Sequence, residues 1–344
     1  MEEVTVKALI LPHPASVETG PLRMIDRPRP EARSGDVLIR VETCGVCHTD
    51  LHIVEGELPP RRAGIVPGHQ VVGRVVSRGP EVTSPTVGAR VGVAWLHRAC
   101  GRCPSCLRGL ENLCPEAAFT GYDVDGGFAE YIVARAEFVY PLPDVFSSVE
   151  AAPLLCAGII GYRALRIAQV AAGDRVGVFG FGASAHLALQ VARHWGCDVY
   201  VFTRGEAHRN LAAELGAAWV GGLEETPPGA VDAGVVFAPS GRVVVEALRH
   251  VRPGGTLAVN AVHLDGIPAF DYARLYGERG LRSVTNSTRA DGQALLALAA
   301  AIPLRPRVEA WPLEEANHVL GRLRRGEVTG AAVLQIAPAL PGAT

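Results

Sequence analysis

The stretch RVGVFGFGASA, from Arg175 to Ala185, decides the architecture of this chain. An apolar run of strand length leads into a glycine turn at Gly180 and Gly182, and a helical pattern follows as far as Trp195. A G-x-G-x-x-A turn between a strand and a helix is the fingerprint of a dinucleotide-binding βαβ unit. The first glycine permits the tight turn, and the second lets a pyrophosphate approach the backbone. A tight turn without a ligand is the alternative, but the strand–turn–helix context favours the binding site.

Strand and helix patterns keep alternating after this stretch. Further strand-like runs lie at 198–203, 233–238, 256–260 and 282–285. Such alternation predicts a parallel, doubly wound sheet. Residues before about 157 differ, because they are rich in Gly and Pro and carry short β-branched runs, at 36–41 and 71–76. They indicate an irregular, strand-based domain.

The fold class expected is therefore α/β, with a β-rich domain and a doubly wound domain. A helix over 313–324 and an apolar run over 331–336 are expected to pack back on the first domain. The predicted domains are 1–157, completed by 303–344, and 158–302. A chain of 344 residues is long enough for two such cores.

Composition excludes several classes of function. A hydrophobic content of 48% and a charged content of 20% describe an ordinary globular protein. The net charge of −2 gives no attraction to nucleic acid or to an anionic membrane. We expect no membrane span, since no stretch approaches about 20 apolar residues. The start, MEEVTVKALILPHP, lacks the features of a secretory signal, so a cytoplasmic location is expected.

Four of the eight cysteines form a cluster with the spacing C-x2-C-x2-C-x7-C. They are Cys100, Cys103, Cys106 and Cys114. Disulfides would be the default in a short secreted chain, but this spacing in a cytosolic protein indicates metal. Four thiolates suit a closed, tetrahedral, structural zinc site.

A second set of metal-binding residue types is spread along the chain. Cys47 lies in CGVCHTDLH, His69 in PGHQ and Cys156 in LLCAG. Two cysteines and one histidine with a vacant fourth position make a catalytic zinc arrangement. The remaining cysteines, Cys44 and Cys197, are interpreted as ordinary buried residues.

These motifs together resemble the zinc-dependent alcohol dehydrogenases of the medium-chain dehydrogenase/reductase (MDR) superfamily, in the bacterial branch akin to cinnamyl alcohol dehydrogenase. CGVCHTDLH, PGHQVVGRV, the four-cysteine loop, GYDVDGGFAEYIV, LLCAGIIGYRAL and the glycine turn occur in the family's order. The resemblance implies a GroES-like catalytic domain, a Rossmann domain that binds NAD(P), and a cleft between them. It also implies a homodimer or homotetramer, built across an edge strand of the Rossmann sheet.

The resemblance implies roles for individual residues. Cys47, His69 and Cys156 would hold the catalytic zinc, and the four-cysteine loop would hold the second zinc. Thr49, the cofactor ribose and His52 would form the proton relay, and Asp50 would orient the zinc-bound histidine. The residues expected to contact the cofactor are His48, Gly180, Gly182, Ala183, Ser184, Thr203, Arg204, Arg209, Ala261 and Val262.

Several positions depart from the family's pattern. Gln70 replaces a Glu near the metal, Ile160 replaces a Thr near the nicotinamide, and Ala331 replaces an Arg that contacts the pyrophosphate. Trp95 matches an aromatic residue of the substrate pocket. Leu58 stands where small-alcohol specialists carry a narrowing Trp, so a roomier pocket is expected.

The cofactor preference depends on the end of the second strand. NAD-specific domains place an acid about 20 residues after the glycine turn, where this chain has Thr203-Arg204-Gly205. A guanidinium can bind a 2′-phosphate bidentately, and Arg209 could add a second charge. Glu206 complicates the interpretation, because Arg204 could pair with it instead. The prediction is NADP(H) preferred and NAD(H) tolerated.

The sequence thus predicts reversible hydride transfer between a small-molecule substrate and NAD(P)+, with zinc as Lewis acid. The expected substrate is a primary alcohol, aliphatic or aromatic. A polyol dehydrogenase or another medium-chain reductase with a different carbonyl substrate is the alternative among enzymes. A zinc-ribbon nucleic-acid binder is the alternative from another class, disfavoured by the charge and by the Rossmann half.

Overall fold

The computed structural model describes residues 4–337, which divide into two compact units. The first unit runs to Cys156 and also takes in Thr288–Ala300 and the described residues from Pro306 onward. The second unit comprises Ala157–Ser287 and Ala301–Arg305. The predicted second domain, 158–302, stays a prediction; in the structure Thr288–Ala300 group with the first unit. The predicted final boundary at residue 344 lies outside the described residues.

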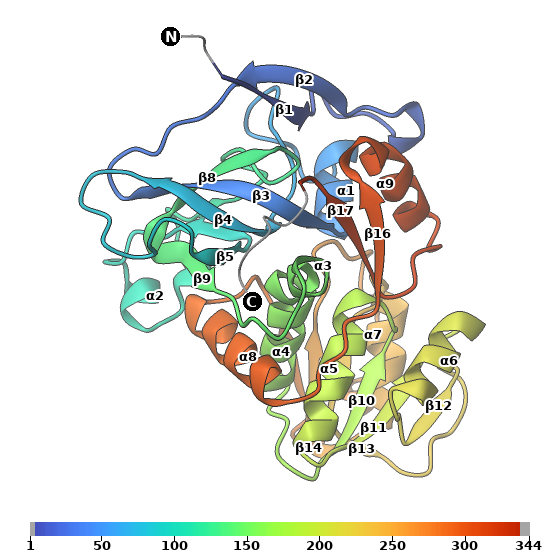
Figure 1. Cartoon of the computed structure of the whole chain (residues 1–344). Coiled ribbons are helices and arrows are strands. Elements are labelled where there is room, and N and C mark those ends of the chain that lie inside the picture. Colours follow the sequence, from blue (N-terminus) through green and yellow to red (C-terminus); the bar gives the residue numbers. More distant parts are fainter. Residues whose placement is uncertain (1–3, 338–344) are drawn as a thin grey trace. The chain divides into compact units, whose positions relative to one another are not determined.

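The first unit is built on a mixed seven-stranded sheet (Figure 1). Its strands, in spatial order, are β16 (Val308–Pro312), β17 (Ala331–Gln335), β3 (Asp36–Val46), β4 (Gln70–Arg78), β5 (Arg90–Val93) and β9 (Val139–Pro141), with β8 (Tyr131–Arg135) also paired to β3. β17 runs antiparallel to β3, which ties the C-terminal segment into this sheet. The β-branched residues of β3 are buried in the unit's main core, as expected for a strand that packs on both sides.

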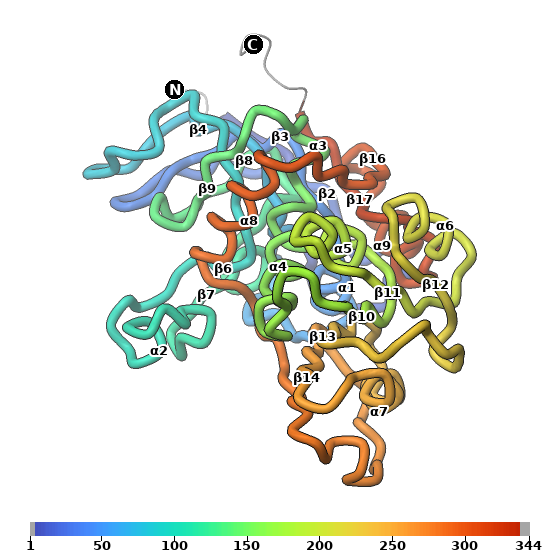
Figure 2. The backbone as a smooth tube through the Cα atoms, turned by 90° about the horizontal axis from the view of Figure 1, so that it is seen from below, coloured from blue at the N-terminus to red at the C-terminus, as the bar shows by residue number. Residues whose placement is uncertain are grey.

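Two small sheets and five α-helices complete the part of the first unit that the structure describes. The sheets pair β1 (Thr5–Ile10) with β2 (Arg23–Pro28) and β6 (Leu96–Arg98) with β7 (Ala118–Phe119). The helices are α1 (His48–Glu55), α2 (Pro104–Leu107), α3 (Ser148–Ala151), α8 (Arg289–Ala301) and α9 (Ala316–Arg324). In Figure 2 the segment that contains α2 projects beyond β6 and β7 as a separate loop.

An ion pair and close packing explain why α8 groups with the first unit. Arg289 donates from Nε to Oε1 of Glu111 at 3.0 Å and from NH2 to Oε2 at 2.8 Å. Its guanidinium also lies 4.4 Å from the centre of the Phe138 ring. At Gly292 a Cβ atom would lie 2.5 Å from the Tyr140 ring, so α8 packs too tightly there for any side chain.

The second unit is a six-stranded parallel sheet. Its spatial order is β12 (Trp219–Gly221), β11 (Asp198–Phe202), β10 (Arg175–Phe179), β13 (Val231–Val236), β14 (Val251–Val259) and β15 (Gly280–Ser283). Numbered along the chain this order is 3-2-1-4-5-6, the order of a Rossmann fold. The predicted fold class, a β-rich domain plus a doubly wound parallel sheet, is confirmed.

Helices cover both faces of this parallel sheet. α4 (Ala157–Ile167) and α5 (Ala183–His194) lie on one face and α7 (Gly241–Ala247) on the other (Figure 2). A further helix, α6 (Glu206–Glu214), packs against β12. Because both faces are covered, the central strand β10 is buried along almost its whole length, which explains its continuous apolar sequence.

One apolar segment requires a correction to the expectation about membranes. The 20-residue stretch Ser148–Ile167 is the one part of the described chain that is long and apolar enough to cross a membrane by length and composition. It is divided among α3, a 3-10 helix at Ala152–Leu155 and α4, and 67% of its most apolar window is buried within the protein. Core helices of folded proteins pass the same test, so the stretch is weak evidence for a membrane span.

Candidate metal centres and cofactor site

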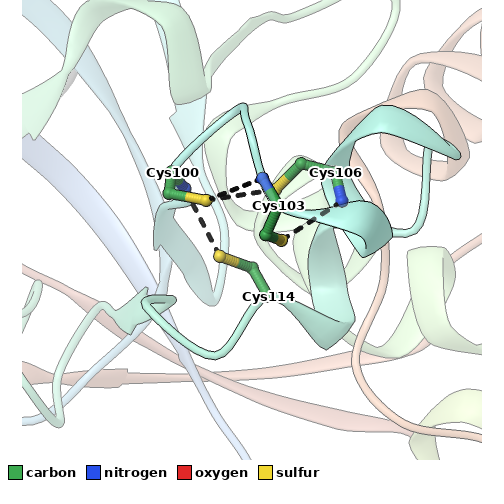
Figure 3. Close-up of side chains that lie close together, drawn as sticks. All are labelled: Cys100, Cys103, Cys106 and Cys114. Carbon is green, nitrogen blue, oxygen red and sulfur yellow. Dashed lines mark hydrogen bonds between the residues drawn. The ribbon is translucent and has the colours of Figure 1, made fainter.

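The thiols of the four-cysteine loop converge on one point (Figure 3). All four Sγ atoms lie within 4.8 Å of one another, and Cys100 Sγ is 4.0 Å from Cys106 Sγ. That separation is far too long for a disulfide, whose S–S bond is about 2.05 Å. Four sulfurs at about 2.3 Å from a tetrahedral zinc would be about 3.8 Å apart, so the loop fits that ion.

Backbone N–H groups of the same loop point at its sulfurs. Cys103 N donates to Cys100 Sγ at 3.3 Å, and Cys100 N donates to Cys114 Sγ at 3.4 Å. Cys106 N donates to Cys103 Sγ at 3.5 Å, which also caps the short helix α2. Backbone hydrogen bonds from Arg102 and Cys103 favour the thiolate form of Cys100 and lower its pKa to about 7. The loop is therefore shaped to hold thiolates around a cation.

The second set of ligands meets because of the register of two strands. Cys47 directly follows β3 and His69 directly precedes β4, and the register of the two strands pairs Gly45 with Gln70. Antiparallel pairing therefore brings Cys47 and His69 to the same end of the sheet. Cys156 follows the 3-10 helix at Ala152–Leu155, which packs on β3 and β4.

The three ligand atoms form a compact group. They lie within 4.8 Å of one another, and His69 Nε2 is 3.4 Å from Cys47 Sγ. A sulfur and a nitrogen bound to one tetrahedral zinc would be about 3.6 Å apart. Three protein ligands leave a fourth position for water or substrate, which is the chemistry of a catalytic zinc.

Asp50 holds this group from the side of the imidazole. Its carboxylate is fully buried, accepts hydrogen bonds from Cys47 N at 2.9 Å and Gly68 N at 3.1 Å, and lies 3.2 Å from His69 Nδ1. A carboxylate at Nδ1 favours a proton there and leaves Nε2 as the metal-binding atom. The orienting role predicted for Asp50 stays a prediction, which this distance is compatible with.

Without a metal ion, Cys47 and His69 both favour their protonated forms. A hydrogen bond with Cys156, together with burial, raises the pKa of the Cys47 thiol well above its usual range. Burial alone would lower the pKa of His69, but Asp50 and Cys47 outweigh burial and raise it to about 10. A dication at this point would reverse both effects, because metal ligands bind as thiolate and neutral imidazole.

The two predicted relay residues lie on α1, one turn apart. Thr49 is buried, and His52 follows it at the i+3 position, so their side chains share one face of the helix. His52 Nδ1 contacts the Glu57 carboxylate. Sequence reasoning missed Glu57; the available signal was Gly56, which is typical of the end of a helix and so of a turn that follows it.

A group of aromatic rings lies on one side of His69. The Trp95 ring meets the His69 ring edge-on at 5.0 Å and stacks on Phe119 at 5.1 Å and on Tyr122 at 5.9 Å. Leu58 is half-buried against the same core. Phe119 and Tyr122 were not predicted from the sequence. Gln70, next to the histidine ligand, is buried.

The glycine turn lies in the second unit, between β10 and α5. Gly180 has φ +89°, which explains the need for glycine there. At Gly182 a Cβ atom would meet nothing within 4 Å, so there is open space beside the backbone, as the approach of a pyrophosphate would require. Ala183 and Ser184 form the first turn of α5, whose N–H groups suit phosphate.

The other predicted cofactor residues of this unit differ in their surroundings. Thr203 is buried at the end of β11, and Arg204 is exposed. Arg209 instead donates from Nε to the Thr203 carbonyl at 3.1 Å and lies 3.3 Å from Glu225. Its charge is therefore already paired. Ala261 and Val262 follow β14, and His48, in the first unit, is exposed at the start of α1.

Comparisons with known proteins agree with this combination of sites. The model of the alcohol dehydrogenase GroES-like domain matches residues 33–144, and that of the zinc-binding dehydrogenase matches residues 185–301. The probable alcohol dehydrogenase AdhA of Mycobacterium tuberculosis is 44% identical over 96% of this chain and 98% of its own length. The chain belongs to the zinc-dependent alcohol dehydrogenases of the MDR superfamily.

Two solved structures of alcohol dehydrogenases resemble the fold. A cinnamyl alcohol dehydrogenase from Sorghum bicolor has a TM-score of 0.87 at 27% identity, covering 99% of this chain and 100% of its own. A thermostable alcohol dehydrogenase from Pyrobaculum aerophilum, with cobalt and zinc bound, has a TM-score of 0.88 at 26% identity, covering 97% and 100%. As a member of this family the protein is a zinc- and NAD(P)-dependent oxidoreductase, which excludes the zinc-ribbon alternative.

Proposed function

We propose that this enzyme interconverts primary alcohols, aliphatic or aromatic, and their aldehydes, with Cys47, His69 and Cys156 as ligands of a catalytic zinc. The observation that carries the proposal is the compact group of three ligand atoms, all within 4.8 Å of one another. Asp50 supports it from behind the imidazole. Three ligands leave one coordination position for the substrate oxygen.

The residues of α1 would manage the proton. Bound zinc would act as a Lewis acid on the substrate oxygen, and the nicotinamide would supply the hydride chemistry. Thr49 would accept a hydrogen bond from the alcohol and pass its proton outward, and His52 would receive that proton as general base. The spacing of three residues on one helix face supports this order.

We further propose two zinc ions per chain, the second bound by the four-cysteine loop. Cys47→Ser should abolish turnover with primary alcohols and leave the thermal unfolding curve almost unchanged. Cys103→Ser should mainly destabilise the fold, because binding of a structural metal is coupled to folding. Metal analysis of wild-type protein should give two zinc ions; one or none would contradict this proposal.

We propose NADP(H) as the preferred cofactor, with NAD(H) accepted. The exposed guanidinium of Arg204 beside the Thr203 hydroxyl supports this preference. Arg209 contributes less than the sequence suggested, because it already pairs with Glu225. The test is kcat/KM with each cofactor in wild type and in Arg204→Ala. A wild-type preference for NADH, or an unchanged ratio in the variant, would refute the argument from Arg204.

The half-buried Leu58 supports a pocket with room for aromatic substrates. Each buried methylene adds about 0.8 kcal/mol, so cinnamaldehyde or benzaldehyde should match or exceed acetaldehyde in kcat/KM. A panel of aldehydes, ketones and polyols also tests the alternative of a different carbonyl substrate. A clear preference for acetaldehyde would refute the roomy pocket, and a preference for polyols would favour that alternative.

We propose a homodimer or homotetramer that works in the cytoplasm. β15 is an edge strand of the parallel sheet, and edge strands offer unpaired backbone groups to a second copy. The exposed rings of Tyr272 and Tyr276 lie just before it in the chain. None of the eight cysteines forms a disulfide, which suits a reducing compartment. Light scattering of the purified protein tests the assembly, and a monomeric mass would contradict it.

A further inference from the structure

The end of helix α1 turns a carboxylate back onto His52. Gly56 follows the helix with φ +82°, and the Leu58 N–H donates to the His52 carbonyl at 3.0 Å. This is a helix-ending turn that favours glycine, and a Cβ at Gly56 would also lie 2.9 Å from Pro14. The turn leaves Glu57 beside the helix, where its Oε2 contacts His52 Nδ1.

This contact fixes where the imidazole carries its proton. An ionised carboxylate can only accept hydrogen bonds, so the contact requires a proton on Nδ1 of His52. In a neutral imidazole Nε2 then has the lone pair, and Nε2 is the atom that can accept a proton. We propose that Glu57 is a positioning residue for the proton relay and acts through His52. The proposal rests on the relay role given to His52 in the proposed function.

The exposure of the three side chains supports a path from the interior to solvent. Thr49 is 8% exposed, the His52 side chain 15% and the Glu57 side chain 46%. Ion pairs this exposed contribute little to folding stability. The contact therefore matters for the orientation and tautomer of His52, and for the imidazolium that forms when a proton arrives.

The neighbouring acids of α1 cannot take this role because they have other partners. Asp50 faces His69, and Glu55 contacts Arg324 and accepts from the Val17 N–H at 3.1 Å. The His48 ring also lies near His52, with centroids 6.3 Å apart. A second imidazole cannot serve as a fixed negative partner, so Glu57 is the carboxylate that this turn supplies.

A double-mutant cycle on the zinc-loaded enzyme tests the proposal. His52→Gln should lower kcat for alcohol oxidation about a hundredfold, as expected for the loss of a general base. Glu57→Ala should lower kcat about tenfold, with KM nearly unchanged. The loss is smaller than that for a buried carboxylate, because an exposed carboxylate orients the His52 imidazole less strongly. Glu57→Gln should fall between, because its amide oxygen still accepts from Nδ1–H. In the His52→Gln background Glu57→Ala should cause no further loss. Glu18→Gln, an exposed acid paired with Arg325, is the matched control and should behave as wild type.

Histidine ring ¹⁵N NMR of the full-length enzyme gives a readout that does not depend on turnover. We expect a protected Nδ1–H signal that is absent in His52→Gln, which assigns it, and lost in Glu57→Ala. A missing Nδ1–H signal in wild type would overturn the proposal. So would losses that multiply in the double variant, because a merely structural defect adds to the loss of His52.

The outcomes separate this inference from the proposed function. An active wild type, a slow His52→Gln variant and a normal Glu57→Ala variant would refute the role of Glu57 alone. A wild type that reduces neither NAD+ nor NADP+ with any primary alcohol would refute the proposed function, whatever the NMR shows, and this inference with it.

Discussion

The buried carboxylate of Asp50 should be the most sensitive support of the three-ligand site. Its two oxygens serve three groups: the backbone N–H groups of Cys47 and Gly68, and Nδ1 of His69. Asp50→Asn keeps the shape but leaves one acceptor oxygen, and the other end becomes an NH2 donor. Whichever way the amide turns, at least one buried N–H then faces a donor.

The magnitude follows from two independent estimates. A buried donor left without its acceptor costs about 1–3 kcal/mol. Loss of a carboxylate that orients a metal-bound histidine lowers metal affinity about 10–100-fold, which is about 1.4–2.7 kcal/mol at 1.36 kcal/mol per factor of ten. We therefore expect Asp50→Asn to lose about 1–3 kcal/mol of unfolding free energy without metal and to bind the catalytic zinc 10–100-fold more weakly.

Chelator competition measures zinc release, and denaturant unfolding of metal-free protein measures stability. The four-cysteine loop should release its zinc as in wild type, because Asp50 does not contact it. Asp26→Asn, an exposed acid on β2, is the control and should change neither quantity. If Asp50→Asn holds its catalytic zinc within twofold of wild type, the argued role of the carboxylate is wrong.

Further predictions concern the glycine turn and the α8 ion pair. Gly182→Ala should leave the melting temperature nearly unchanged, since its Cβ meets nothing within 4 Å. It should weaken dinucleotide binding about tenfold, because the new methyl group fills the space beside the backbone. An unchanged affinity in titration calorimetry would contradict this. Gly180→Ala, at φ +89°, should instead lower stability by about 1–2 kcal/mol. Burial alone would raise the pKa of Glu111, but Arg289 lowers it below 4.5. The carboxylate therefore stabilises the fold at neutral pH, and this stabilisation is lost as the pH falls through the lowered pKa. Urea unfolding should give wild type a larger free energy of unfolding than Glu111→Gln at pH 7, and this difference should shrink below pH 4.5. A difference in unfolding free energy that stays the same at all pH values would contradict the ion-pair argument.

Local patterns in the sequence were enough to predict most strands and helices of the second unit. The strand–turn–helix motif around Gly180 lies within eleven consecutive residues, so it can be recognised without knowledge of long-range contacts or of homologues. β12 was missed because it has only three residues and no distinct period. The four-cysteine site was predictable for the same local reason.

Long-range partners were the part that the sequence could not supply. Cys47 and His69 meet through the register of β3 and β4, and spacing alone does not state that register. Residues 289–301 have the pattern of an ordinary helix. That pattern does not indicate whether the helix packs in the first unit or in the second. Their partner Glu111 lies 178 residues away in the chain. Arg209 was predicted to contact the cofactor, which stays a prediction, but the sequence did not indicate that Glu225 lies 3.3 Å from its guanidinium.

The pairing of β17 with β3 has a consequence for the order of events during synthesis. Ala332 pairs with Val46, so 286 residues (332 − 46) separate the two partners. At about 5–20 residues per second, a ribosome needs about 15–60 s to make the second partner after the first. The Rossmann unit is nearly contiguous and can fold within this interval. During this interval the edge of β3 near Cys47 has unpaired backbone N–H and C=O groups, because β17 has not yet been made. Exposed strand edges of this kind pair with strands of other chains. A nascent chain halted before residue 331 should therefore be a strong client for chaperones, although every zinc ligand has already been made.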